Sequence, residues 1–187
     1  MAHPLHDGRR AHDPGALLAT THRIPGGGSV RLRLARPSDA PRVSAFLSDL
    51  SPETAHRRFG SSTSERLVRH FTFYDPRRRL IVAATMPVDG RERIVGLADV
   101  AVLDTGLAEI GLVVSDGEQR LGIGTVLADA VAALAARRGA THVKAEMVER
   151  NAGMIRVMER LGRTVHTVEN GHAVAYTRIA PASARAA

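Results

Sequence analysis

The amino-acid sequence predicts one α+β domain, with a mixed and mostly antiparallel sheet flanked by helices. Its 187 residues are enough for one compact domain and too few for two large ones. Hydrophobic residues make up 44% and charged residues 24%, which is typical of a globular protein. Away from the two ends, short runs with the period of a strand alternate with longer runs that have the period of a helix.

The first part of the domain predicts one strand followed by helices. Residues 30–35 alternate Val or Leu with Arg, the pattern of a half-buried strand. A helix should follow, capped by Ser38 or Asp39, because apolar side chains recur after these residues at helical spacing. A second helical segment is expected to begin at Ser51, and a third to span residues 64–73.

The middle of the chain predicts an antiparallel meander of three strands, over residues 80–86, 93–103 and 108–115. Short turn signals separate them, at Asp89-Gly90 and at residues 104–106. Strands joined by such short turns run antiparallel to their neighbours.

The last part of the domain predicts two helices and three more strands. A long helix over residues 122–138 should end at Gly139, because glycine is common directly after a helix. Because this helix separates two strands, it predicts a crossover at the centre of the sheet. The remaining elements are expected to be a strand at 141–147, a helix at 151–161, and strands at 164–168 and 173–179 around the hairpin signal Asn170-Gly171.

Both ends of the chain lack a core-forming pattern. Residues 1–28 are rich in Gly, His, Pro and Arg, and predict a flexible N-terminal arm. His3, His6 and His12 lie in this arm without a further ligand set, so no metal site is expected. Residues 29–180 then form the domain, and residues 181–187 a short tail.

Composition narrows the classes of function. The 26 basic and 19 acidic residues leave a net charge of +7, which favours acidic partners. Aromatic residues are only 3% and the arginines are scattered, so we expect no specific nucleic-acid binding. No run approaches eighteen apolar residues and no secretory signal is visible, so we expect a cytoplasmic protein without a membrane span. The absence of cysteine excludes disulfides, thiolate metal sites and cysteine nucleophiles.

A glycine-containing loop joins the third meander strand to the long helix, and it is the most informative motif. It reads Gln119-Arg-Leu-Gly122-Ile-Gly124. Glycines at such a junction let a ligand approach the backbone, and the free N–H groups of a helix start suit a pyrophosphate. A dinucleotide fingerprint needs glycine where Leu127 stands, and a nucleotide-triphosphate loop needs Gly-Lys-Ser or Gly-Lys-Thr. Tight strand-to-helix packing is the alternative explanation of these glycines.

The Gln-x-x-Gly-x-Gly motif after an apolar strand resembles the acetyl-CoA pyrophosphate loop of the GNAT N-acetyltransferase superfamily. The order of elements is similar as well, over residues 29–179. Further motifs resemble the acetyltransferase domain of bacterial Pat-type protein lysine acetyltransferases: Leu50-Ser51-Pro52-Glu53, Arg58-Phe59, Ala108-Glu109-Ile110 and Asn151-x-x-Met154-Ile155-Arg156.

The resemblance implies acetyl-CoA as co-substrate and a set of residues that bind it. Strand residues 112–114 would pair with the acetyl-pantetheine arm, and loop residues 119–125 would surround the pyrophosphate. Asn151 would hydrogen-bond the arm, or would only cap its helix. The expected cofactor-binding residues are Leu112, Val113, Val114, Gln119, Arg120, Leu121, Gly122, Ile123, Gly124, Thr125 and Asn151.

Transfer to an amine requires a base, because an amine with a pKa of about 10.4 is protonated at neutral pH. Glu109 is the leading candidate, since a charged residue interrupts an apolar strand there and Pat-type sequences also place a glutamate there. Glu146 on the neighbouring strand is the second candidate. Many GNAT enzymes use a tyrosine as general acid where this chain has Met158, so solvent is expected to protonate the departing thiolate.

The resulting hypothesis is an acetyl-CoA-dependent N-acetyltransferase that modifies a protein lysine, with an acyl-CoA synthetase as one candidate protein. Two alternatives stay open: the same chemistry on a small amine or amino-acid derivative, and a non-catalytic acyl-CoA-binding module. A monomer and a homodimer are both compatible with the sequence.

Overall fold

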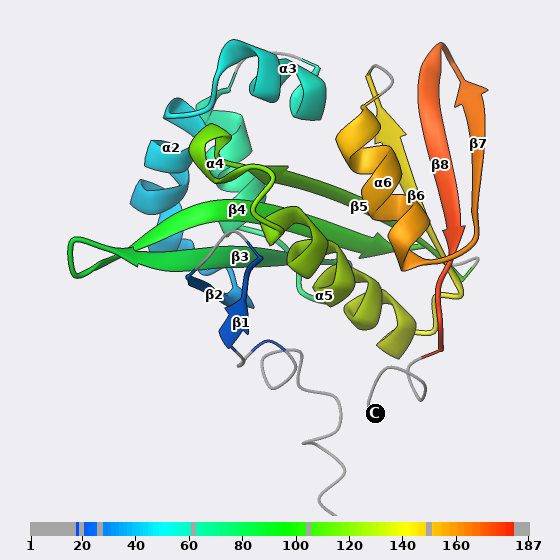
Figure 1. Ribbon diagram of the computed structural model, residues 1–187, viewed down its shortest axis with the longest axis horizontal. Helices are drawn as coiled ribbons and strands as arrows, with labels where there is room; N and C mark the ends of the chain where they lie inside the picture. Colours follow the sequence, from blue (N-terminus) through cyan, green and yellow to red (C-terminus); the bar gives the residue numbers. More distant parts are fainter. Residues whose placement is uncertain are drawn as a thin grey trace, which may run out of the picture.

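The computed structural model describes residues 18, 21–25, 28–60, 63–103, 106–148 and 151–181. Figure 1 shows one twisted sheet with helices on both faces. The strands are β1 (Thr21–Arg23), β2 (Ser29–Leu34), β3 (Arg79–Val88), β4 (Arg91–Val102), β5 (Leu107–Val114), β6 (His142–Met147), β7 (Thr164–Glu169) and β8 (His172–Arg178). The helices are η2 (Pro37–Asp39), α2 (Ala40–Ser48), α3 (Pro52–Phe59), α4 (Glu65–Thr72), η3 (Asp116–Glu118), α5 (Ile123–Arg137) and α6 (Ala152–Leu161).

The strand order in the sheet is β1-β2-β3-β4-β5-β6-β8-β7. All neighbouring strands pair antiparallel except β5 and β6, which pair in parallel. The parallel pairing follows from the connection between them. The long helix α5 carries the chain back to the end of the sheet at which β5 starts, so β6 runs in the same direction as β5. This confirms the predicted mixed, mostly antiparallel α+β sheet and its central crossover.

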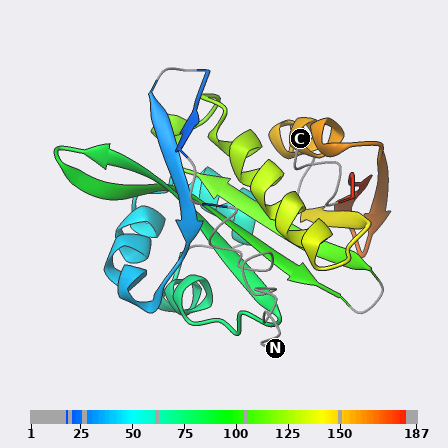
Figure 2. The ribbon, with the colours of Figure 1, turned by 90° about the horizontal axis from the view of Figure 1, so that it is seen from below.

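Each face of the sheet has its own hydrophobic core. Helices α5 and α6 cover one face, with a large core around Leu127, Val131 and Met158. Helices α2 and α4 cover part of the other face, with a smaller core around Phe46 and Phe71 (Figure 2). No helix in the described part of the chain is both long and apolar enough to cross a membrane.

The predicted hairpin turns are confirmed where the structure describes them. Asp89 and Gly90 join β3 to β4 with φ of 50° and 73°, and Asn170 and Gly171 join β7 to β8 with φ of 51° and 82°. Two successive residues with positive φ match the turn that suits the twist of paired strands. The third predicted turn contains residues 104 and 105, which lie outside the described residues.

The N-terminal segment differs from the prediction of a flexible arm over residues 1–28. Residues Thr21–Arg23 form β1, which pairs with β2, and Leu18 and Ile24 are buried in the large core. Leu18 stands in a short apolar run and Ile24 stands alone, and together they show no period, so their burial depends on tertiary contacts that the sequence pattern does not reveal. The rest of the predicted arm, and residues 182–187 of the tail, lie outside the described residues.

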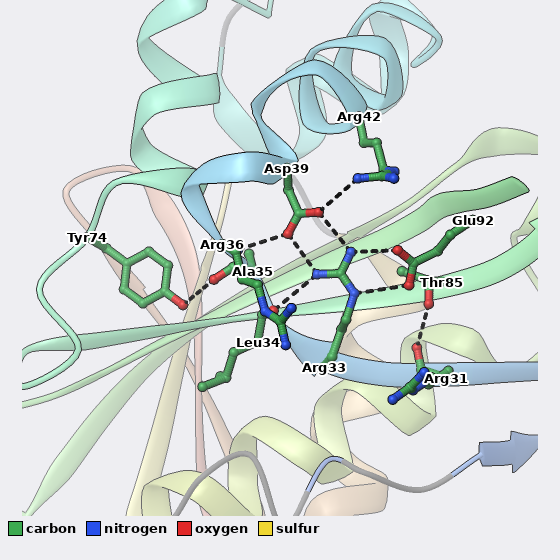
Figure 3. A network of polar contacts seen from close by, with 10 residues as sticks. All are labelled: Arg31, Arg33, Leu34, Ala35, Arg36, Asp39, Arg42, Tyr74, Thr85 and Glu92. Carbon is green, nitrogen blue, oxygen red and sulfur yellow. Dashed lines mark hydrogen bonds and ion pairs between the residues drawn. The ribbon is translucent and has the colours of Figure 1, made fainter.

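A partly buried ion cluster ties the end of β2 to η2 and β4 (Figure 3). The Arg33 guanidinium donates to both oxygens of Asp39 at 2.7 and 2.8 Å, and to both oxygens of Glu92 at 3.0 and 2.9 Å. The Arg36 amide also donates to Asp39. Asp39 is the N-cap of α2, which is one of the two predicted positions. Its side chain makes no capping hydrogen bond with α2 and accepts hydrogen bonds from Arg33 instead.

Candidate active site

The site begins where β5 and β6 separate. The two strands pair only at three positions, Leu107–Glu109 with His142–Lys144, although β5 continues to Val114 and β6 to Met147. A pocket of about 1020 Å³ lies beyond this point. Residues of α3, α4, β5, α6 and the loop before α5 line it, so elements far apart in the sequence enclose one space.

One edge of β5 is therefore free to bind an extended ligand. The Ser115 amide donates to the Val95 carbonyl at 2.9 Å, so alternate residues from Ser115 backwards direct their polar groups toward β4. The polar groups of Leu112 and Val114 then face the opposite edge. The Gln119 side chain agrees with this, since its Nε2 donates to the Val114 carbonyl at 3.2 Å.

Gln119 also connects the loop to helix α3. Its Nε2 donates to Oγ1 of Thr54 at 3.1 Å, and Thr54 Oγ1 donates to Asp116 at 2.6 Å. The amide and hydroxyl of Ser51 donate to the same carboxylate at 2.9 and 2.8 Å. These bonds hold the start of α3 against the loop after β5, so Gln119 shapes the pocket wall.

The loop that follows presents unpaired backbone amides at the start of α5. Arg120 and Gly122 adopt positive φ of 64° and 95°, and no amide of residues 120–124 donates to a backbone carbonyl of the described residues. Gly122 is the N-cap of α5 without a side-chain cap, and a Cβ there would lie 2.7 Å from Cδ of Pro25. Open amides at a helix start, with its partial positive charge, form a site that suits a phosphate group.

Most of the predicted cofactor-binding residues line this pocket, and two do not. Leu121 packs against the large core, and Ile123 is buried in it with 1% of its surface exposed. Val113 reaches the pocket but is also part of the smaller core. The predicted residues that line the pocket are Leu112, Val113, Val114, Gln119, Arg120, Gly122, Gly124, Thr125 and Asn151.

Asn151 stands at the start of α6, in the wall of the pocket. Its Oδ1 accepts a hydrogen bond from the Met154 amide at 3.1 Å, so it caps the helix. The capping role that the sequence left open is present, and it fixes the side chain at the pocket surface.

Both candidate carboxylates line the same pocket. Glu109 is exposed and makes no hydrogen bond or ion pair with another described residue. Glu146 is engaged: its Oε1 lies 2.5 Å from Nδ1 of His172, and its Oε2 lies 3.9 Å from Nζ of Lys144. Glu109 is thus the carboxylate with free oxygens. Met158, at the position of the family tyrosine, is completely buried and offers no proton to a leaving group.

A cluster of charged residues on the α3 and α4 side was not predicted. Asp99 of β4 forms ion pairs with Arg58 of α3 and Arg79 of β3, and Nη1 of Arg79 lies 2.9 Å from Nε2 of His70 on α4. All four residues line the pocket. The sequence held one signal for it, since Asp99 interrupts the apolar run of β4 as Glu109 interrupts that of β5.

One arginine of this cluster, Arg58, crosses β5 at a glycine. A Cβ added to Gly111 would overlap the Arg58 guanidinium. Gly111 is the Cα partner of Asp99, so strand register brings the glycine and the aspartate to the same level. The missing side chain therefore gives Arg58 its place in the pocket.

Comparisons with known proteins agree with this architecture. The model of the acetyltransferase (GNAT) family matches residues 45–162. The GNAT domain of S. lividans PAT is 25% identical with a TM-score of 0.75, over 86% of this chain and 96% of that one. A search of curated proteins found no match.

Two structures of lower identity share the fold. A cAMP-binding acyltransferase from Mycobacterium smegmatis is 22% identical with a TM-score of 0.61, and the match covers 96% of this chain and 53% of that protein, about half its length. AAC(6')-Ib in complex with paromomycin and acetyl-CoA is 19% identical with a TM-score of 0.61, over 84% of this chain and 97% of that one. Because the family model spans more than half of the sequence and the fold agrees, the chain belongs to the GNAT family of acetyltransferases.

Proposed function

We propose that the protein transfers the acetyl group of acetyl-CoA to a primary amine, and that this amine belongs to a protein lysine. One observation carries the proposal. In the pocket between β5 and β6, a free strand edge, the open amides of residues 120–124 and the exposed carboxylate of Glu109 come together. The choice of a lysine acceptor follows from the resemblance to Pat-type enzymes. The 25% identity of this chain to the GNAT domain of S. lividans PAT supports that choice.

The residues fit acetyl-CoA in two parts. The backbone edge at Leu112 and Val114 suits an amide-containing arm, which can add to a sheet edge like a further strand. The amides around Gly122 and Gly124 suit the pyrophosphate, and a Cβ at Gly124 would come only within 3.7 Å of Leu112 Cδ1, so space remains above the backbone. Arg120 adds positive charge at the same loop.

Glu109 acts as the base in this proposal. The amine must lose a proton before its nitrogen attacks the thioester carbonyl, and a carboxylate in reach accepts that proton. The C–N bond then forms, the nitrogen releases its second proton to solvent as the C–S bond breaks, and CoA leaves as a thiolate that takes a proton from solvent. Because Glu109 is exposed, it returns its proton to water directly.

The test measures release of free CoA thiol from acetyl-CoA with a panel of acceptors. The panel contains intact acyl-CoA synthetases, polyamines, amino acids and aminoglycosides. Thiol release with an intact protein, and acetyl-lysine in that protein by mass spectrometry, are the expected results. Release only with small amines would contradict the protein acceptor. Binding of acetyl-CoA without release by any acceptor would instead indicate a binding module.

A further inference from the structure

We propose that the pocket binds a carboxylate of the acceptor next to its reactive amine, through Arg58 and Arg79, so that amines with a nearby acidic group are preferred. The inference rests on the proposed function and names the class of acceptor that this site takes. It concerns the part of the pocket that is lined by residues of α3, α4, β3 and β4.

The Arg58 and Arg79 groups share one counter-ion. Oδ1 of Asp99 pairs with Nη2 of Arg58, and Oδ2 of Asp99 pairs with Nη1 of Arg79 at 3.0 Å. The Asp99 side chain is only 11% exposed, and those of the two arginines are 24% and 33% exposed. One carboxylate neutralises one of the two guanidinium charges, so these three partly buried side chains keep one positive charge.

His70 does not change this balance. Burial lowers the pKa of His70. The negative charge of Asp99 raises this pKa, whereas the positive charges of Arg79 and Arg58 lower it further. The neutral imidazole accepts a hydrogen bond from Nη1 of Arg79 at 2.9 Å. His70 therefore fixes the guanidinium without adding charge.

The arginines have donors to spare. A guanidinium offers five N–H groups, and Asp99 takes only one from each arginine. Nε of Arg58 is buried and has no hydrogen-bond partner among the described residues. The guanidinium also lies 5.2 Å from the ring centre of Phe59, which restricts its orientation. Oriented donors with leftover positive charge match a second carboxylate.

Strand geometry sets the distance between this charge and the proposed base. The Arg58 guanidinium occupies the position where Gly111 would carry a side chain. Glu109 lies two residues earlier on the same strand, so its side chain is on the same face, about 6.6 Å along it. An amine at Glu109 and a carboxylate at Arg58 would thus be about 6.6 Å apart.

A further arginine that lines the pocket has a charge of the same sign. Arg66 of α4 is exposed, lines the pocket and makes no ion pair with another described residue. It adds attraction for an approaching anion, although solvent screens it more than the two partly buried arginines.

The first experiment compares matched acceptors that differ only in this charge. The small probes are β-alanine, γ-aminobutyrate, δ-aminovalerate and ε-aminocaproate, each against its amide. The protein arm uses lysine peptides with glutamate or glutamine beside the lysine. We expect kcat/KM from thiol release to favour the carboxylate by about ten- to a hundredfold, as for hydrogen bonds to a charged group. A preference seen only with the small probes, or only with the peptides, identifies the source of the carboxylate.

Variants locate the effect. Arg58→Met should abolish most of the preference, while Arg69→Met, an exposed arginine on α4 outside the pocket, should keep it. Arg66 is exposed, so Arg66→Met should reduce the preference for carboxylate acceptors only partly. An Arg58→Met protein with wild-type preference would overturn the assignment to this arginine.

A second readout needs no turnover. The N-acetylated form of the best carboxylate probe and its amide are titrated against the wild-type protein by calorimetry. Tighter binding of the carboxylate supports the site. Equal binding of the two, or equal kcat/KM for the charged and neutral acceptors while thiol release continues, overturns it and leaves the acetyltransferase proposal standing. Loss of thiol release with every acceptor would count against the proposed function instead.

Discussion

Glu109 and Glu146 enter one pocket from neighbouring strands, but only Glu109 has both oxygens free among the described residues. Glu109→Gln keeps the size of the side chain and removes its ability to accept a proton near neutral pH. We expect turnover to fall by about a hundredfold to ten-thousandfold, with nearly unchanged affinity for acetyl-CoA. Steady-state kinetics and calorimetry measure the two quantities.

The pH dependence of this variant separates base catalysis from positioning. The loss should shrink as the pH rises, because solvent then deprotonates more of the amine without help. Glu146→Gln is the matched control and should keep most of the turnover. If Glu146→Gln shows the large loss and Glu109→Gln does not, the roles are reversed; if neither slows acetylation, no carboxylate acts as base.

Gly124 is the better of the two loop glycines for testing the cofactor site. Gly122 has φ of 95° and contacts Pro25, so a side chain there would strain the fold, whereas a Cβ at Gly124 meets only ordinary contacts at 3.7 and 3.8 Å. Gly124→Glu should therefore fold, obstruct the open amides and add negative charge. We expect calorimetry to show acetyl-CoA binding weakened by at least about tenfold, or about 1.4 kcal/mol. Gly124→Ala serves as the control, and wild-type affinity in folded Gly124→Glu would disprove the assignment.

Strand β1, Leu18 and Ile24 belong to the folded unit, although the sequence predicted a flexible arm there. Ile24 is 4% exposed in the large core. Ile24→Ala should lower the free energy of unfolding by about 2–5 kcal/mol, because it leaves a cavity. Arg23→Ala, at an exposed position of β1, should change it little. Urea denaturation measures both, and equal stability of the two variants would show that Ile24 does not support the core.

The cluster around Asp39 links β2, η2 and β4 and makes stability depend on pH (Figure 3). Burial alone would raise the pKa of Asp39, but the hydrogen bonds from Arg33 and the Arg36 amide, with the nearby positive charges, outweigh it and hold the pKa below its usual range. Its contribution is therefore complete above the pKa of an unfolded aspartate, about 3.9, and is lost as the pH falls through the folded value.

Asp39→Asn tests this contribution. The variant should be less stable at pH 7 by about 1–3 kcal/mol, because Arg33 loses a charged partner. Its deficit relative to the wild type should narrow below about pH 4. Denaturation curves across this range give the comparison, and a deficit that is independent of pH would rule out the ion pair as its cause.

At the scale of the whole molecule, three residue pairs between β5 and β6 connect the two parts of the sheet. A ligand bound between the diverging strands contacts both parts and binds only the folded state. Acetyl-CoA at a hundred times its Kd should raise the free energy of unfolding by about 2.7 kcal/mol, seen as a higher Tm. Gly124→Glu at the same concentration should show no such shift; an unchanged Tm in the wild type would contradict the site.

The sequence by itself determined the fold class, the order of strands and α-helices from β2 onwards, the hairpin turns at Asp89-Gly90 and Asn170-Gly171, and the loop at residues 119–124. Each of these depends on residues close together in the chain, where the period of apolar side chains and the preferences of turn residues are local physical properties. Glu109 could be found in the same way, as a charge within an apolar strand.

Only the tertiary structure decided how distant residues meet. Arg58, His70, Arg79 and Asp99 come from four different elements, and their cluster depends on the register of β4 with β5 and on the missing side chain of Gly111. Likewise, the divergence of β5 and β6, which opens the pocket, and the burial of Leu18 and Ile24 depend on packing across the sheet. These contacts are non-local, so no period or spacing within a single segment specifies them.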